Sequence, residues 1–169
     1  SKSILIWRAM LQWLGGIGII VIAIAIFPIL KIGGMQLFQS EFSSKEEKVL
    51  PRTTKIATGI GFVYFFLTII CSFSLFITGM TGFDSVAHGM TIIATGGFST
   101  KDMSIGFFDS VYIEVVTIFF MILSSLPFIL LFQSIRGKLM DLVASSQVRF
   151  FLILIFSVTI LVAFWLKRY

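Results

Sequence analysis

The sequence has few charged residues, one cysteine and one histidine. Charged residues make up 12% of its 169 positions, about half of the roughly 25% typical of soluble domains. Cys71 cannot form an internal disulfide, and its apolar surroundings indicate a small buried residue. Since His88 is the only histidine, Ser124 and Ser125 lack a base at their depth. These absences disfavour a soluble domain and an intramembrane hydrolase, and we expect no enzymatic activity.

Apolar residues dominate what is present. They make up 57% of the chain, with 20 phenylalanines among them, and the mean hydropathy is +1.05. This composition predicts an integral membrane protein embedded in a lipid bilayer. The net charge of +5 comes from basic residues at the ends of apolar segments rather than from one stripe. That distribution reports membrane topology, so we expect no nucleic-acid partner.

Four long apolar segments are candidate membrane spans, at residues 4–30, 56–77, 110–132 and 150–166. The connection 31–55 holds five lysines and arginines and is predicted to be cytoplasmic. A second basic connection, 134–148, is predicted on the same side. Residues 79–109 carry three acids against one lysine and are predicted outside. Pro28 is expected to kink or end the first span.

A shorter apolar segment, at about residues 83–93, has helical spacing and begins with the capping-box pair Thr81 and Asp84. At 1.5 Å per residue it reaches roughly 16 Å, about half of a bilayer core. It therefore enters from outside and returns. Its C-terminal end, the negative pole of the helix dipole, then faces the loop that follows.

That loop runs from Ala94 to Thr100 and suits a desolvated cation. Gly96 and Gly97 permit unusual dihedral angles that aim carbonyl oxygens inward, and Thr95 adds a hydroxyl. Because the loop holds no carboxylate, a monovalent cation is favoured over calcium or magnesium. An ordinary turn between helices is the alternative interpretation.

Four stretches together resemble the Trk/Ktr/HKT superfamily of potassium transporters, and within it the TrkH-like subunits. The likeness covers nearly the whole chain and is strongest over residues 7–100. The stretches are Ala94–Thr100, Phe83–His88, Ile32–Leu37 and Trp7–Gly18.

The resemblance implies four span–pore–span repeats around one pore, of which this chain holds one in full. The expected fold is all-α integral membrane, an incomplete potassium-channel type with a re-entrant pore helix between spans. Residues 1–30 are interpreted as the last transmembrane helix of a preceding repeat and 31–55 as a cytoplasmic loop. Residues 56–133 form the complete pore repeat, 134–148 a cytoplasmic loop, and 149–169 the first transmembrane helix of a following repeat.

The resemblance also implies a site and partners. Ala94, Thr95, Gly96 and Gly97 are the expected potassium selectivity filter, with Gly97 as its key glycine, and Phe98 and Ser99 support it. Potassium is the expected transported ion, with no cofactor and no other metal. A homodimer and a cytoplasmic nucleotide-binding regulatory subunit of TrkA type are the expected partners, in a bacterial inner membrane. Because one strand cannot surround an ion, the alternative is a non-conducting fragment or membrane scaffold. The chain also starts without methionine, as a piece of a longer protein would.

Several polar residues allow two interpretations. His88 lies four residues after Asp84, and the pair could hold a metal or carry protons, or His88 could be a hydrogen-bonded packing residue. Glu114 is either a functional acid inside the membrane or a solvated one near the interface. Arg8 pairs with an acid of the preceding repeat or extends to the headgroups. The glycines at 15, 16 and 18 suit helix packing better than a nucleotide loop.

Overall fold

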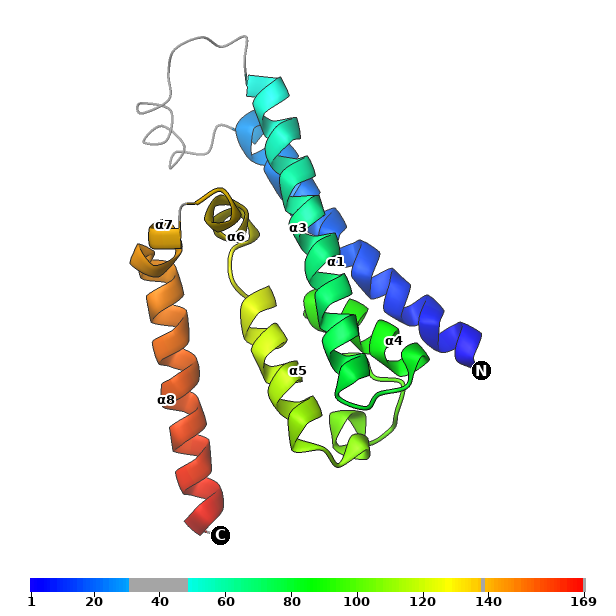
Figure 1. Cartoon of the computed structure of the whole chain (residues 1–169). Coiled ribbons are helices and arrows are strands. Elements are labelled where there is room, and N and C mark those ends of the chain that lie inside the picture. Colours follow the sequence, from blue (N-terminus) through cyan, green and yellow to red (C-terminus); the bar gives the residue numbers. More distant parts are fainter. Residues whose placement is uncertain (31–48, 138, 169) are drawn as a thin grey trace. The chain divides into compact units, whose positions relative to one another are not determined.

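The computed structural model describes residues 1–30, 49–137 and 139–168, and over these residues all regular structure is helical (Figure 1). The chain divides into two compact units, Ser1–Ser125 and Leu126–Tyr169. The all-helical fold predicted from the sequence is confirmed over the described residues.

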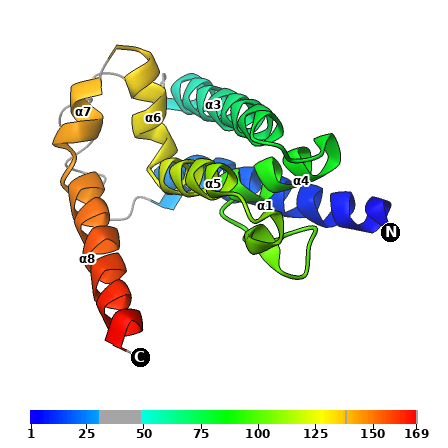
Figure 2. The same cartoon turned by 60° about the horizontal axis from the view of Figure 1, so that its bottom comes forward.

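The first unit has four α-helices and one short 3-10 helix. They are α1 (Lys2–Leu30), α3 (Val49–Ile77), α4 (Gly82–Ile93), η2 (Ser104–Phe108) and α5 (Val111–Ser124). The short helix α4 contacts α1, α3 and α5 (Figure 2). Its inner face and the facing sides of α3 and α5 supply most of the buried residues, among them Tyr64, Cys71, Leu75, Ile93 and Phe120. The interpretation of Cys71 as a small buried residue is confirmed.

Two helices among the described residues are long and apolar enough to cross a membrane, Ile56–Ile77 within α3 and Ser146–Arg168. The helix α3 itself begins at Val49, inside the segment expected as a loop up to residue 55. Pro51 lies in its first turn, where a missing N–H costs no intrahelical bond. Helix α1 ends at Leu30, shortly after Pro28. Most of the expected cytoplasmic loop, residues 31–48, lies outside the described residues.

The segment expected as one span over residues 110–132 is broken. Helix α5 ends at Ser124, and α6 (Phe128–Ile135) follows Pro127. Proline has no N–H for the helix, and its ring clashes with the carbonyl of Leu123, four residues earlier. It also disfavours the helical conformation at Leu126. The two helices pass the length and composition test for a membrane span only when taken together.

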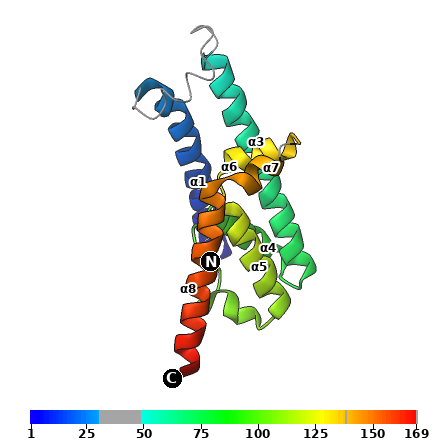
Figure 3. The ribbon, with the colours of Figure 1, turned by 90° about the vertical axis from the view of Figure 1, so that its left-hand side faces the viewer.

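The second unit contains α6, α7 (Leu139–Ala144) and α8 (Ser146–Arg168), the last drawn in orange to red in Figure 3. The short helix α7 occupies part of the segment expected as a cytoplasmic loop over 134–148. Helix α8 begins three residues before the predicted boundary at 149. None of the most apolar 18-residue window of α8 is buried among the described residues.

Candidate functional site

Helix α4 begins at the capping box that the sequence indicates. The Thr81 hydroxyl accepts a hydrogen bond from the Asp84 amide (3.2 Å) and donates one to the Asp84 carboxylate (2.9 Å). The helix has 12 residues, so it reaches about 18 Å at 1.5 Å per residue. The prediction of a short helix at about residues 83–93 is confirmed in length and position.

The six predicted site residues, 94–99, all lie in the loop that follows α4. Ala94 caps the helix, the Thr95 amide donates to the Ile92 carbonyl (3.0 Å), and the Gly96 amide donates to the Thr91 carbonyl (2.8 Å). Thr95 and Gly97 both have left-handed backbone, with φ of 52° and 69°. For a β-branched residue such as Thr95 this conformation is strained, at a cost of roughly 1–3 kcal/mol.

The two loop glycines are required for different reasons. Gly97 has a positive φ, and Gly96 does not. A Cβ on Gly96 would instead overlap the side-chain amide of Gln12 on α1. The side chains and backbone at 95–97 are exposed within the described chain, while Phe98 and Ser99 are half-buried.

Helix α1 contacts the loop directly. Gln12 Nε2 donates to the Gly96 carbonyl (3.3 Å), and the Arg8 guanidinium lies 4.7 Å from the centre of the Phe98 ring. Neither contact was predicted. The cation–π contact is a third alternative for Arg8, beside the ion pair and the headgroups.

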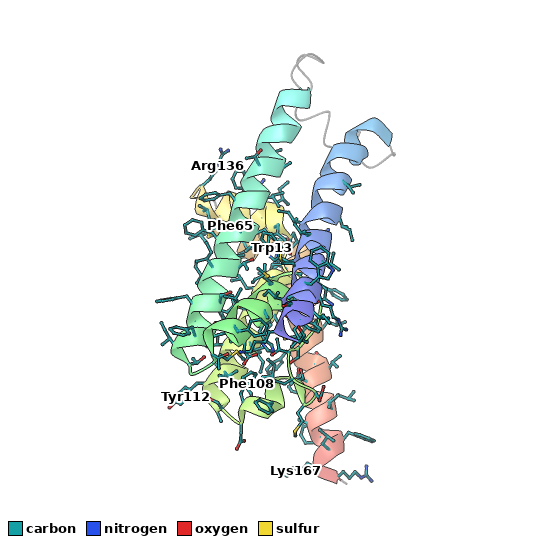
Figure 4. All side chains as sticks on the ribbon, turned by 90° about the vertical axis from the view of Figure 1, so that its right-hand side faces the viewer. Trp13, Phe65, Phe108, Tyr112, Arg136 and Lys167 are labelled. Atoms are coloured by element: carbon teal, nitrogen blue, oxygen red, sulfur yellow. The ribbon has the colours of Figure 1, made fainter. Side chains whose placement is uncertain are left out.

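Helices α1 and α3 are joined by hydrogen bonds close to the loop. Tyr64 donates to the Trp13 carbonyl (2.8 Å), and the Trp13 indole donates to the Thr68 hydroxyl (2.9 Å). Trp13 also packs edge-on against Phe65, 6.4 Å between ring centres (Figure 4). These contacts fix the part of α1 that carries Gln12, and the close approach of the Tyr64 hydroxyl to Gly16 supports helix packing as the role of that glycine.

The N-terminal end of α4 holds a buried carboxylate. Asp84 is 4% exposed, accepts a hydrogen bond from the Thr100 hydroxyl (2.6 Å) and lies 3.5 Å from the Lys101 ammonium. Hydrogen bonds with Thr100 and Thr81 and the charge of Lys101 thus surround the Asp84 carboxylate.

A cavity of about 310 Å³ lies between the loop, α4 and α5. Much of its lining is hydroxyl-bearing: Thr91, Thr95, Ser99, Ser104, Thr117 and Ser125. The buried Thr117 hydroxyl has no hydrogen-bond partner among the described residues. The loop thus borders a mostly apolar space, to whose lining the loop, α4 and α5 contribute several hydroxyl-bearing residues.

Among the described residues no group of three or more histidine, cysteine or acidic side chains could hold a metal ion. His88 Nδ1 bonds the backbone carbonyl of Asp84 (2.7 Å) rather than its carboxylate. The geometry favours the packing interpretation of His88 over the metal and proton-carrying alternatives. Glu114 is exposed at the first turn of α5.

A half-length helix that returns through a glycine loop, next to long apolar helices, defines a membrane protein of the pore-loop class. The family model for TrkH, described as a cation transport protein, matches residues 1–167, and the chain belongs to this family. The TrkH potassium uptake protein of Vibrio parahaemolyticus is 46% identical over 79% of this chain and 28% of its own length. The potassium uptake protein TrkI of Halomonas elongata is 40% identical over 98% of this chain and 34% of its own.

A solved structure gives the same result. The crystal structure of the potassium transporter TrkH from Vibrio parahaemolyticus matches with a TM-score of 0.64 and 39% identity, over 87% of this chain and 27% of that one. The chain therefore spans about a third of the length of the relatives it matches.

Proposed function

We propose that the chain takes part in potassium uptake by supplying one selectivity-filter strand of a TrkH-like transporter. The strand is Ala94, Thr95, Gly96 and Gly97, with Phe98 and Ser99 as its support. Membership of the family and the potassium uptake for which the relatives are named support potassium as the ion. One observation carries the proposal: α4 ends, after only 12 residues, at a loop whose exposed residues 95–97 follow the negative pole of the helix.

The chemistry of the loop supports a monovalent cation. Backbone carbonyls can replace the hydration shell of potassium, and the left-handed backbone at Thr95 and Gly97 turns successive peptide groups away from a helical direction. No carboxylate lies between residues 94 and 100, so the strand lacks the ligands that divalent ions prefer. Potassium is the transported ion, and the proposal includes no cofactor.

The domain assignment belongs to the same proposal. Residues 56–133 are one pore repeat, and 1–30 and 149–169 are helices of the neighbouring repeats. The basic connections 31–55 and 134–148 face the cytoplasm of a bacterial cell whose inner membrane the chain crosses several times. The length of the relatives, about three times that of the chain, supports further repeats in the working transporter.

Complementation of a potassium-uptake-deficient bacterium tests the filter. The chain is expressed alone and also in place of the matching segment of the Vibrio parahaemolyticus TrkH, so that a complete pore surrounds the strand. We expect the chimaera to restore growth at low potassium and Gly97→Asp to abolish it. Gly106→Asp is the matched control, because a Cβ on Gly106 meets no atom within 4 Å. Growth that survives Gly97→Asp would overturn the filter assignment.

A second candidate is a non-conducting fragment or membrane scaffold. The observation that favours it is that the chain holds one pore loop and spans about a third of its relatives. Rescue by the chain alone would exclude it. Absence of rescue by the chain alone, with rescue by the chimaera, would show that the strand works only within a larger assembly.

The proposed protein partners rest on the resemblance. They are a second copy of the transporter and a cytoplasmic nucleotide-binding subunit of TrkA type. Co-purification of the chimaera with the Vibrio parahaemolyticus regulatory subunit, and its size in detergent by light scattering, check both. A monomeric chimaera that captures no subunit would remove both partners from the proposal.

A further inference from the structure

We propose that one face of α4, formed by Asp84, His88 and Thr91, positions the strand that leaves the filter, and that His88 thereby helps to set potassium-over-sodium discrimination. This inference rests on the proposed function, and His88 acts as a positioning residue without touching the ion.

The three side chains share one face of the helix because they are spaced at i, i+4 and i+7. Each bonds one of three consecutive residues of the returning strand. The Thr100 hydroxyl donates to the Asp84 carboxylate (2.6 Å), Ser99 bonds His88 Nε2 (2.9 Å), and Thr91 donates to the Phe98 carbonyl (2.9 Å). The strand therefore runs antiparallel to α4, with a hydrogen bond at every residue.

The partners of His88 determine its tautomer. Nδ1 lies 2.7 Å from the Asp84 backbone carbonyl, which can only accept, so Nδ1 carries the proton. In the neutral ring Nε2 is then an acceptor, and the Ser99 hydroxyl must donate to it. Ser99 in turn accepts from the Lys101 amide (3.1 Å). The three hydrogen bonds therefore form one continuous chain. The Lys101 amide donates to Ser99, Ser99 donates to His88, and His88 donates to the Asp84 carbonyl.

The ring of His88 has little freedom. The residue is 2% exposed, and its ring packs edge-on against Phe108, 5.6 Å between centres. A buried ring held at both nitrogens and at one edge is a rigid support for Ser99. The other members of the set are equally buried on the helix side, since Asp84 is 4% and Thr91 1% exposed.

Contacts on both sides of the filter glycine hold the loop in place. Gly96 is held through Gln12 on one side of Gly97, and residues 98–100 are held through α4 on the other. Discrimination between potassium and sodium depends on the placement of the filter carbonyls. Loss of the His88–Ser99 bond should therefore change ion selectivity.

Two substitutions remove that bond from opposite sides. His88→Phe keeps an aromatic ring against Phe108 and loses both ring hydrogen bonds, while Ser99→Ala loses the bond to His88 and also the acceptor of the Lys101 amide. Each is introduced into the chimaera, and uptake of potassium and of sodium is measured in cells. We expect each to lower the potassium-to-sodium uptake ratio by about five- to tenfold, the effect of one buried hydrogen bond. The double variant should lose no more than the larger single effect.

Two controls separate positioning from simple destabilisation. Ser74→Ala removes a hydroxyl bond within α3, to the Ile70 carbonyl, and should leave the ratio unchanged. His88→Gln, whose amide can still meet Ser99, should recover part of the ratio. An unchanged ratio in both His88→Phe and Ser99→Ala, with uptake retained, would overturn the inference.

If no variant of the chimaera takes up potassium, a second measurement tests whether His88 supports the returning strand. Amide hydrogen exchange of the purified chain reports directly how well the amides of the returning strand are protected by hydrogen bonds. We expect faster exchange at Lys101 in His88→Phe than in the unmodified chain, and equal rates would overturn the inference. A chimaera with the unmodified chain that takes up no potassium would count against the proposed function and leave this readout intact.

Discussion

Two glycine clusters face each other in the first unit and serve different ends. The cluster in α1 consists of Gly15, Gly16 and Gly18, and the cluster in the loop of Gly96 and Gly97. In α1 only Gly16 has close neighbours: a Cβ added there would lie 2.7 Å from the Tyr64 hydroxyl and 3.2 Å from the Ala94 Cβ. Gly96 leaves room for Gln12, and Gly97 supplies a left-handed backbone.

The comparison shows that adjacent glycines are not interchangeable. Gly16 lets α1 approach Ala94, the first residue of the loop, and Gly96 lets the loop approach α1. Gly16 and Gly96 therefore lie on opposite sides of the same contact between α1 and the loop. Gly97 has no part in it, since it has no neighbour within 4 Å of a Cβ position. Substitutions by alanine separate these three roles.

The largest loss of stability is expected for Gly16→Ala. The added methyl meets the Tyr64 hydroxyl, the Ala94 side chain and, at 3.3 Å, the Ala94 backbone. Overpacking of this kind costs roughly 1–3 kcal/mol. Thermal unfolding in detergent should show a lower midpoint, and potassium uptake of the chimaera should fall because the loop moves. An unchanged midpoint would contradict the close contact between α1 and the loop.

Gly97→Ala is expected to cost less stability, roughly 1–2 kcal/mol, from a left-handed alanine alone. No steric contact adds to it. Uptake of potassium by the chimaera should fall steeply, while the unfolding midpoint should fall less than in Gly16→Ala. Gly97→Asn is the matched control, because asparagine adopts this backbone more readily. If asparagine and alanine are equally harmful, backbone conformation is not what Gly97 supplies.

The local features of this site could be predicted from the sequence. The capping box and the spacing of the apolar residues placed α4 to within one residue, since both act within a few positions of the chain. Pro127 carried a local signal too, and it breaks the segment expected as one span. The spacing of Asp84 and His88 indicated an i, i+4 pair, but it did not reveal that the returning strand lies against this face or that Thr91 takes part.

The contacts between distant segments could not be predicted in this way. Gln12 and Gly96 are 84 positions apart, and only the approach of α1 to the loop brings them together. The same holds for Arg8 above Phe98. The division of labour between Gly96 and Gly97 follows from that approach, so a sequence pattern that treats them as a pair assigns both the same role.

Gly96→Ala should have a smaller effect than either substitution above. The new methyl meets the flexible end of Gln12, which can move away at the loss of its bond to the Gly96 carbonyl. We expect about 0.5–1.5 kcal/mol, the net value of one hydrogen bond. Unfolding of Gly96→Ala, Gln12→Ala and the double variant measures the coupling. Gln12→Ala removes the clash, so purely additive losses would show that the two residues do not touch.

The smallest effects are expected for Gly15→Ala and Gly18→Ala. A Cβ added at either position would meet no atom within 4 Å, and both positions lie within α1. Alanine is a better helix former than glycine by about 1 kcal/mol in water, so the unfolding midpoint should stay or rise slightly, and potassium uptake should be unchanged. These two substitutions test the glycines of α1 at which no steric contact is expected. A loss as large as that of Gly16→Ala would mean that a whole glycine face of α1 packs against another segment of the assembled transporter, and that the contact with Ala94 is only one part of a longer interface.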